Sequence, residues 1–232
     1  MKLPPIIVLC GGFGNRIKSI TKEKPKILLE VNGKPFLSWI LDVFEKNKIE
    51  EVYLSVSYRE DLVNEYVQEN IKSNLSINLV SDGVKPLGTG GALIKTCKKV
   101  GDEFLVTYGD SYLTTNFSRF YQFARNFSAT MAIYKNNNAY DKSNVLLSDD
   151  KSIYYNKSNP QSNFNHIDYG LLYFKSNFFQ NFEENTFLDL SDLLHLESIK
   201  MNLYGYEVTD RFYEIGSSDG IRDFENYLKN SL

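Results

Sequence analysis

Short apolar runs alternate with amphipathic segments along the first half of the chain, and this alternation constrains the fold more than any other feature. The run at residues 5–10 has the continuous pattern of a buried strand and ends at Gly11 and Gly12. Strands are predicted again at 51–57, 77–80 and 104–108, and helices at 35–47, at 61–72 and from about Thr89 onward. Repeated strand–helix–strand units at this spacing predict an α/β fold with a parallel sheet that binds ligands at the carboxyl ends of its strands.

The second half differs in composition, because it is rich in Asn, Ser, Tyr and Phe. Turn signals separate its strand-like segments, which are 130–134, 144–147, 153–155, 167–174 and 202–208. A closing helix is predicted at 220–228. Since neither an internal repeat nor a long Gly/Ser linker divides the sequence, we expect residues 1–232 to form a single domain with two lobes, 1–115 and 116–232.

Composition excludes several classes of protein. With 232 residues, 42% of them hydrophobic, the chain is long enough for one large α/β domain with a substantial core. A formal net charge of −3 gives no global electrostatic reason to bind nucleic acid or anionic lipid. Two cysteines, Cys10 and Cys97, form neither a disulfide framework nor a zinc motif. The longest early apolar run, 6–9, is too short for a signal sequence or a membrane span. We therefore expect a cytoplasmic protein that binds neither nucleic acid nor a membrane.

A glycine-rich loop follows the first predicted strand, with the sequence Leu-Cys-Gly-Gly-Phe-Gly-Asn-Arg over residues 9–16. Glycines allow backbone N–H groups to approach an anion closely, and Arg16 adds a cation with a bidentate fork. A dinucleotide fingerprint and a Walker A loop both need Gly at position 17, which is Ile17. The loop therefore indicates an anion site of another type, or else an ordinary tight turn.

Lysines follow the glycine loop in the segment Lys24-Pro25-Lys26. Pro25 favours an extended conformation at Lys24, so we expect Lys24 and Lys26 to project to the same side. A lysine held near an anion loop is suited to charge that develops on a phosphoryl group. The alternative is a solvated basic loop.

These motifs, together with Val-Asn-Gly-Lys-Pro-Phe-Leu at 31–37, resemble the amino-terminal signature of the sugar-1-phosphate nucleotidylyltransferases. Leu-Gly-Thr-Gly-Gly-Ala at 87–92 is similar to a second nucleotide-binding segment of this family, and Tyr108-Gly109-Asp110 to its metal-binding strand end. Within the family the chain looks nearest to the bacterial D-glycero-D-manno-heptose-1-phosphate guanylyltransferases. The resemblance implies a Rossmann-like α/β/α sandwich with a mostly parallel mixed sheet, with a nucleotide-binding lobe at 1–115 and a sugar-phosphate-binding lobe at 116–232.

The resemblance also implies residue roles for the nucleotide. Arg16 would contact the phosphates, and Lys26 would steady charge on the α-phosphate. The implied nucleotide-binding residues are Leu9, Gly11, Gly12, Gly14, Asn15, Asp82, Gly88, Thr89 and Gly109. Gly88 to Gly91 opens a predicted helix, so its N–H groups are expected to face an anion or polar ligand. Asp82 would accept hydrogen bonds from a guanine base, but an Asx-turn before Gly83 explains it equally well, so the nucleobase stays open.

For the metal, the resemblance implies Mg²⁺ held by Asp110 and Glu214. Mg²⁺ takes one or two carboxylates together with phosphate oxygens. The stretch Phe-Tyr-Glu-Ile-Gly-Ser at 212–217 departs from the family, which has Asp where this chain has Glu214. Because glutamate is one methylene longer, direct coordination and contact through water both stay open for Glu214.

For the sugar phosphate, the implied residues are Tyr112, Asn156, Lys157, Asp168 and Gly170. Lys157 matches the lysine of a family Glu-Lys-Pro segment, although Asn156 replaces its Glu and no Pro follows directly. Asp168 would bind sugar hydroxyls, and Gly170 would permit close approach of the ring. Tyr112 either lines the sugar pocket or only packs.

The implied reaction joins a nucleoside triphosphate and a sugar 1-phosphate to give a nucleotide sugar and pyrophosphate. The preferred pair is GTP and D-glycero-D-manno-heptose 1-phosphate, for surface polysaccharide precursors. The attacking phosphate is already anionic, so no general base is expected. Alternatives are cytidylyl, uridylyl or thymidylyl transfer to another sugar or polyol phosphate, a non-catalytic regulatory homologue, and a P-loop NTPase, against which Ile17 argues. The oligomeric state stays open, although the Tyr- and Phe-rich second half can supply a homodimer surface.

Overall fold

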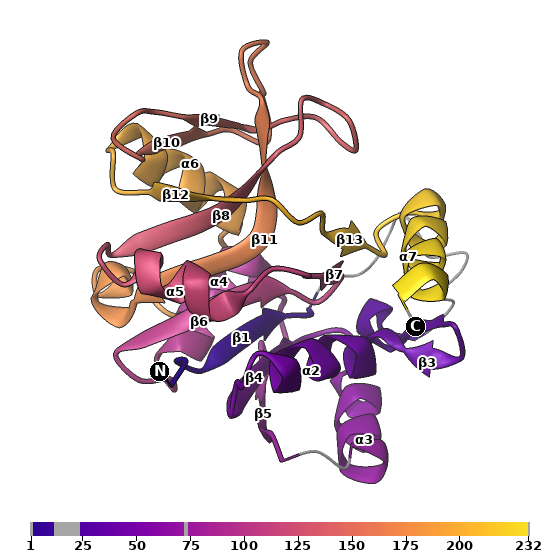
Figure 1. Ribbon diagram of the computed structural model, residues 1–232. Coiled ribbons are helices and arrows are strands. Elements are labelled where there is room, and N and C mark those ends of the chain that lie inside the picture. The colour runs from indigo at the N-terminus through magenta and orange to yellow at the C-terminus, as the bar shows by residue number, and fades with distance from the viewer. Residues whose placement is uncertain (1, 12–23, 72–73, 232) are drawn as a thin grey trace.

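A nine-stranded sheet forms the centre of the molecule in a computed structural model, which describes residues 2–11, 24–71 and 74–231. Its first half is parallel, in the order β6–β1–β4–β5 (Figure 1). These strands are β1 (Ile6–Leu9), β4 (Glu51–Val56), β5 (Ser76–Ser81) and β6 (Glu103–Tyr108). The predicted α/β fold with a mostly parallel mixed sheet is confirmed.

Antiparallel strands extend the sheet beyond β6. The long strand β11 (His166–Lys175) pairs antiparallel with β6 and then with β8 (Ala129–Lys135), to which β12 (Tyr204–Val208) adds in parallel. Two short strands, β9 (Val145–Leu147) and β10 (Ile153–Tyr155), continue from the first part of β11. Separate two-stranded pairs are β7 (Ser111–Tyr112) with β13 (Tyr213–Glu214), and β2 (Glu30–Val31) with β3 (Lys34–Pro35).

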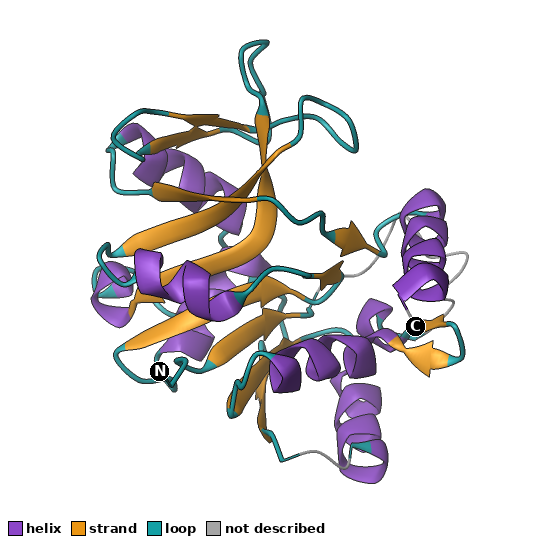
Figure 2. Ribbon diagram, viewed as in Figure 1, coloured by secondary structure: helices purple, strands orange, loops and turns teal. Residues whose placement is uncertain are grey.

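Helices cover both faces of the sheet (Figure 2). One face carries α2 (Phe36–Lys46), α3 (Glu60–Asn70) and α5 (Phe117–Ala124), while α7 (Ser218–Ser231) packs against α2 and β13 beside the sheet (Figure 1). The other carries α4 (Gly88–Cys97) and α6 (Leu190–Ile199), and short 3-10 turns lie at Lys26–Leu28 and Ser176–Phe179. Helix α5 was not predicted. Helix α7 begins two residues before the predicted start, since Ser217 Oγ accepts the Gly220 N–H at 3.0 Å as an N-cap does.

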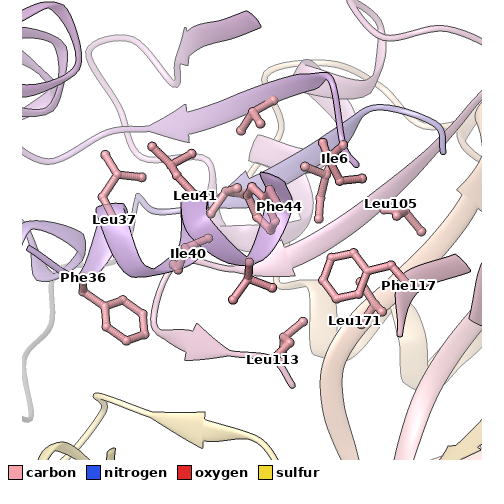
Figure 3. Close-up of a cluster of buried hydrophobic side chains, with 14 of the residues drawn as sticks. Ile6, Phe36, Leu37, Ile40, Leu41, Phe44, Leu105, Leu113, Phe117 and Leu171 are labelled. Atoms are coloured by element: carbon pink, nitrogen blue, oxygen red, sulfur yellow. The ribbon is translucent and has the colours of Figure 1, made fainter. Parts of the chain in front are cut away.

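Helix α2, which was predicted at 35–47, packs an apolar stripe onto the sheet (Figure 3). Phe36, Ile40 and Phe44 are at most 2% exposed and lie in one cluster with Ile6 of β1 and Leu171 of β11. Complete burial of such a side chain stabilises a fold by about 1.5–3 kcal/mol. The stripe therefore joins α2 to strands from both halves of the chain.

Aromatic residues of the second half mainly fill the core. Tyr155, Tyr169, Tyr173 and Phe174 are each at most 1% exposed, whereas Tyr140 and Phe187 are largely exposed. The abundance of Tyr and Phe therefore reflects packing, and does not by itself mark a surface for a homodimer. Among the helices that the structure describes, none combines the length and the apolar character needed to cross a membrane.

Candidate active site

The carboxyl ends of β1 and β6 meet at one edge of the sheet, where a cavity of about 800 Å³ opens. From β1 the chain continues to β4 and β5 on one side and then returns to β6 on the other side of β1, so the strand order reverses there. Ligands bind α/β sheets at such a switch point. Leu9 lies opposite Tyr108, and the Gly109 N–H donates to the Leu9 carbonyl at 2.9 Å. A Cβ on Gly109 would lie 3.0 Å from Cys10 Cβ and 3.1 Å from Leu9 O, so this close approach favours glycine.

Three charged groups from distant segments gather at this edge. Lys26 Nζ donates to Asp110 Oδ2 at 2.5 Å, and its side chain is only 16% exposed. Pairing of β7 with β13 places Glu214 opposite Ser111, directly after Asp110. A Cβ on Gly216 would lie 3.4 Å from Lys26 Nζ and 3.6 Å from Glu214 Oε1. Both charged groups therefore lie next to Gly216. The structure therefore brings together Lys26, Asp110 and Glu214.

Lys24 does not share this environment. Its Nζ lies 3.5 Å from Glu30 Oε1 in an exposed ion pair, so the prediction that Lys24 and Lys26 project to one side is wrong. The 3-10 turn that begins at Lys26 ends the extended conformation, and the alternation of side chains ends with it.

Asp110 and Glu214 offer the hard oxygen donors that Mg²⁺ prefers. Both line the cavity, in which phosphate oxygens can supply further ligands. No group of three or more His, Cys, Asp or Glu side chains that could hold a metal occurs among the described residues. A pair of carboxylates fits an ion that is bound jointly with phosphate oxygens.

A second wall of the cavity, the sugar-side wall that the family resemblance assigns to the sugar phosphate, is formed where β11 bends. A register shift lies between Asp168 and Leu172, and Gly170 within it has φ +89°, which favours glycine. The Gly170 N–H donates to Asp168 Oδ1, and the Tyr108 hydroxyl donates to Asp168 Oδ2, both at 2.9 Å. Burial raises the pKa of Asp168, while these two donors and the charge of Lys157 lower it. The bend thus holds a carboxylate in the wall of the cavity, with Lys157 also lining it.

The glycines at the start of α4 serve packing against the segment 186–189. The Gly90 and Gly91 N–H groups donate to the Leu188 carbonyl at 2.8 and 3.1 Å, so they do not face a ligand as predicted. A Cβ added to Gly88 would lie 2.5 Å from the Leu188 carbonyl oxygen, and one added to Gly91 would lie 2.3 Å from the Thr186 carbonyl oxygen. Gly88 also has φ +72°. Of this segment, Thr89 lines the cavity.

Three further predicted residues are not among the described residues that line the cavity. Asp82 is 8% exposed, its Oδ2 accepts the Leu87 N–H at 3.2 Å, and burial raises its pKa. Tyr112 packs on the ring of Phe224, with centroids 4.7 Å apart. Asn156 Oδ1 accepts the Asn159 N–H at 2.8 Å. Each of these side chains therefore has a structural partner.

Of the glycine loop, Leu9 lines the cavity, and a Cβ on Gly11 would lie 3.7 Å from Asp82 Oδ2. The other predicted residues of this loop lie outside the described residues; they are Gly12, Gly14, Asn15 and Arg16.

Sequence reasoning missed Arg211, which lines the cavity beside Tyr140, Phe212 and Tyr213. Arg211 comes three residues before Glu214, so its position next to a candidate metal ligand was the available signal. Its aromatic neighbour Tyr140 lies 71 positions away along the chain, and no local pattern links the two.

A model of the nucleotidyl transferase family matches residues 6–201. The chain belongs to the nucleotidyl transferase family. It is similar to a curated D-glycero-alpha-D-manno-heptose 1-phosphate guanylyltransferase of Campylobacter jejuni, with 41% identity over 116 residues, which are 49% of this chain and 50% of that relative. A protein of the same name from Aneurinibacillus thermoaerophilus is 26% identical over 97% of this chain and 99% of its own length.

Solved structures of other proteins share the fold. HddC from Yersinia pseudotuberculosis, which has also been solved in complex with GMP-PN, superposes with a TM-score of 0.82 over 97% of this chain and 100% of its own, at 19% identity. An inositol-1-phosphate CTP transferase from T. maritima superposes with a TM-score of 0.81 over 100% of this chain and 98% of its own, also at 19% identity. The sheet with helices on both faces is therefore the fold of nucleotidyl transferases.

Proposed function

We propose that this protein is a sugar-1-phosphate nucleotidylyltransferase, which converts a nucleoside triphosphate and a sugar 1-phosphate into a nucleotide sugar and pyrophosphate. The observation that carries the proposal is the contact between Lys26 and Asp110, with Glu214 alongside, in a cavity at the switch point of the sheet. Membership of the nucleotidyl transferase family supports it independently.

In this reaction a phosphate oxygen of the sugar 1-phosphate attacks the α-phosphorus of the nucleotide. One P–O bond forms as the bond to pyrophosphate breaks, and the electron pair leaves with pyrophosphate. The attacking oxygen is already anionic, so no side chain has to remove a proton. The task of the protein is to bring two anions together and to offset the charge of the transferring group.

Lys26 is the described group best placed to offset that charge, because its ammonium is largely buried at the strand ends. Asp110 and Glu214 would hold Mg²⁺, which supplies Lewis-acid stabilisation of phosphate oxygens when it is bound. Arg16 would contact the phosphates, as the family resemblance implies. Lys157 and Asp168 line the other wall, where they would orient the sugar phosphate.

For the substrates we propose GTP and D-glycero-D-manno-heptose 1-phosphate, with the nucleotide sugar serving surface polysaccharide synthesis. The names of the two heptose 1-phosphate guanylyltransferases support this choice, one of them over nearly the whole chain. The alternatives are cytidylyl or uridylyl transfer, because solved structures of similar fold include an inositol-1-phosphate CTP transferase and a UDP-glucose pyrophosphorylase.

The test is pyrophosphate release with Mg²⁺, for each of GTP, CTP, UTP, dTTP and ATP against a panel of sugar and polyol phosphates that includes the heptose 1-phosphate. We expect release only when one nucleotide and one sugar phosphate are both present, and loss of release with EDTA. Release from a nucleotide alone would indicate an NTPase instead. Nucleotide binding without release from any pair would indicate a non-catalytic homologue.

A further inference from the structure

Arg211 is held rigidly in the cavity wall between β12 and β13. Its guanidinium carbon lies 3.9 Å from the ring centroid of Tyr140 and 4.8 Å from that of Tyr213, so aromatic rings contact its faces. Arg211 Nη2 donates to Asp223 Oδ2 at 2.6 Å, and the Arg211 carbonyl accepts from Thr114 Oγ1 at 2.7 Å. The two rings, Asp223 and the bond to the backbone carbonyl therefore fix the orientation of the Arg211 guanidinium, and with it the direction of the N–H groups that do not contact Asp223.

These remaining donors of Arg211 lack acceptors among the described residues. Nε is buried and has no hydrogen-bond partner, and only Nη2 donates to a described side chain. Because Nε is closed off from solvent, a ligand in the cavity can meet only the guanidinium end of the side chain, which is 29% exposed. A guanidinium end that is held by its neighbours at a cavity wall, with only one of its N–H groups donating to a described side chain, is suited to a ligand that brings further acceptors.

The position of Arg211 assigns it to the sugar-phosphate side. The adjacent Phe212 packs edge-on against Tyr169, with ring centroids 5.5 Å apart. Tyr169 lies between Asp168 and Gly170 on the bend of β11, which forms the sugar-side wall. Arg211 thus lies next to that wall.

The charges that line the cavity indicate which kind of ligand Arg211 would bind. Carboxylates outnumber cations among the described lining residues; the carboxylates are those of Asp110, Asp141, Asp168, Asp189, Glu214, Asp219 and Asp223, and the cations are those of Lys26, Lys157 and Arg211. A phosphate dianion is repelled by such a wall except where a cation faces it. Lys26 contacts Asp110, and the charge of Lys157 acts on Asp168. The planar fork of arginine matches a phosphate group in two-point contact.

We propose that Arg211 binds the phosphate of the acceptor sugar 1-phosphate and is a specificity-determining residue of the reaction. This inference rests on the proposed nucleotidylyl transfer. The two rings and Asp223 orient the guanidinium before the substrate arrives, so little side-chain entropy is lost when the phosphate binds.

The experiment compares the full-length wild type with Arg211→Gln and with Arg222→Gln as the matched control. Arg222 lies on α7, is 69% exposed and pairs with Asp219. For Arg211→Gln we expect the KM for the sugar phosphate to rise at least about tenfold. The KM for the nucleotide should stay within about twofold of the wild-type value. The shift in melting temperature that the nucleotide causes should stay within about 1 °C of the wild-type shift. Arg222→Gln should match the wild type in both constants.

Arg211→Lys covers the case in which Arg211→Gln fails to fold, because lysine keeps the charge but loses the fork and the stacking. We expect it to raise the sugar-phosphate KM by a smaller factor than Arg211→Gln. A rise in both KM values together, or in neither, would overturn the assignment and leave Arg211 a structural residue.

Titration with inorganic phosphate, followed by calorimetry, tests Arg211 separately from turnover. If the wild type releases no pyrophosphate with any pair, the proposed function fails, but phosphate binding can still be compared. Binding that weakens at least about tenfold in Arg211→Gln and is unchanged in Arg222→Gln supports a phosphate site. Equal binding by both variants, or a higher sugar-phosphate KM without weaker phosphate binding, contradicts it.

Discussion

The two walls of the cavity are built in different ways. On the wall proposed for the nucleotide, parallel strands β1 and β6 end at the same edge, so Leu9, Gly109 and Asp110 meet because of topology alone. On the wall proposed for the sugar, antiparallel strands meet at a bend in β11, where Asp168 lies next to a register shift that contains Gly170 with its positive φ. The first wall is encoded by short motifs at strand ends, whereas the second is encoded by backbone geometry and by contacts between distant segments.

This difference means that the two walls should respond differently to substitution. Substitution of Lys26 or Asp110 on the nucleotide wall should abolish turnover and leave the fold intact. Changes on the sugar wall should mainly affect affinity for one substrate.

The largest effect is expected for Lys26→Ala and Asp110→Ala. Removal of one group that stabilises developing charge typically lowers the rate about 10²–10³-fold. Each variant should therefore be nearly inactive in pyrophosphate release, while circular dichroism shows the native fold. Asp42→Asn is the control, because Asp42 also pairs with a lysine, Lys34, but on the exposed surface of α2. Turnover like that of the wild type in either Ala variant would contradict its role.

A large loss of stability, without a role in the chemistry, is expected for Gly91→Ala. The added Cβ would lie 2.3 Å from the Thr186 carbonyl oxygen, and overpacking of this kind typically costs about 1–3 kcal/mol. Chemical denaturation should show this loss. Gly101→Ala is the matched control, since no atom lies within 4 Å of its Cβ position and its stability should not fall. If Gly91→Ala is as stable as Gly101→Ala, the packing explanation of this glycine is wrong.

A smaller and selective effect is expected for Asp168→Asn on the sugar wall. The amide oxygen can still accept the Gly170 N–H, but the NH2 group replaces the oxygen that accepts from the Tyr108 hydroxyl, and the charge that binds hydroxyl groups strongly is lost. The KM for the sugar phosphate should rise about tenfold, and the KM for the nucleotide should not change. Steady-state kinetics with each substrate varied in turn measures the split.

Stability against pH tests the environment of Asp168 further. Burial raises its pKa above the ordinary value of 3.8, so the neutral form contributes stability below that value, and this contribution is lost as the pH rises through the folded-state pKa. Asp168→Asn, which does not titrate, should therefore gain stability relative to the wild type as the pH rises above 3.8. Asp150→Asn should change in the opposite direction, because hydrogen bonds from Ser152 lower the pKa of Asp150.

The smallest effect is expected for Tyr112→Phe. Tyr112 packs against Phe224 and Tyr227, and its ring is kept in the variant. Both KM values should remain within about twofold of wild type, which would settle its role as packing. Tyr108→Phe is the informative partner, since it removes a hydrogen bond to Asp168 and should raise the sugar-phosphate KM. A larger effect of Tyr112→Phe than of Tyr108→Phe would reverse these assignments.

Much of the fold could be predicted because it rests on local periodicity. The α2 stripe and the strands β1, β4 and β6 follow from apolar patterns that tertiary packing only completes. Helix α5 was missed although its signals are present, since Asn116 caps it and Phe117, Phe120 and Tyr121 form its buried face.

The candidate site was predictable where a motif marks a strand end, and less so elsewhere. Asp110 and Glu214 were both named from short motifs, and the structure places them together with Lys26. The glycines that begin α4 were assigned to a ligand, because the sequence does not reveal that segment 186–189 packs on them. Arg211 was missed for the same reason, since its contact with Tyr140 depends on the tertiary fold.

The most direct test of nucleotidylyl transfer at this site is exchange of labelled pyrophosphate into the nucleoside triphosphate, measured with Mg²⁺ in the presence and absence of the sugar phosphate. Direct transfer between the two bound substrates predicts exchange only when the sugar phosphate is present, and none in Lys26→Ala. Exchange with the nucleotide alone would show a nucleotide bound covalently to the enzyme, and no exchange under any condition would contradict the proposed activity.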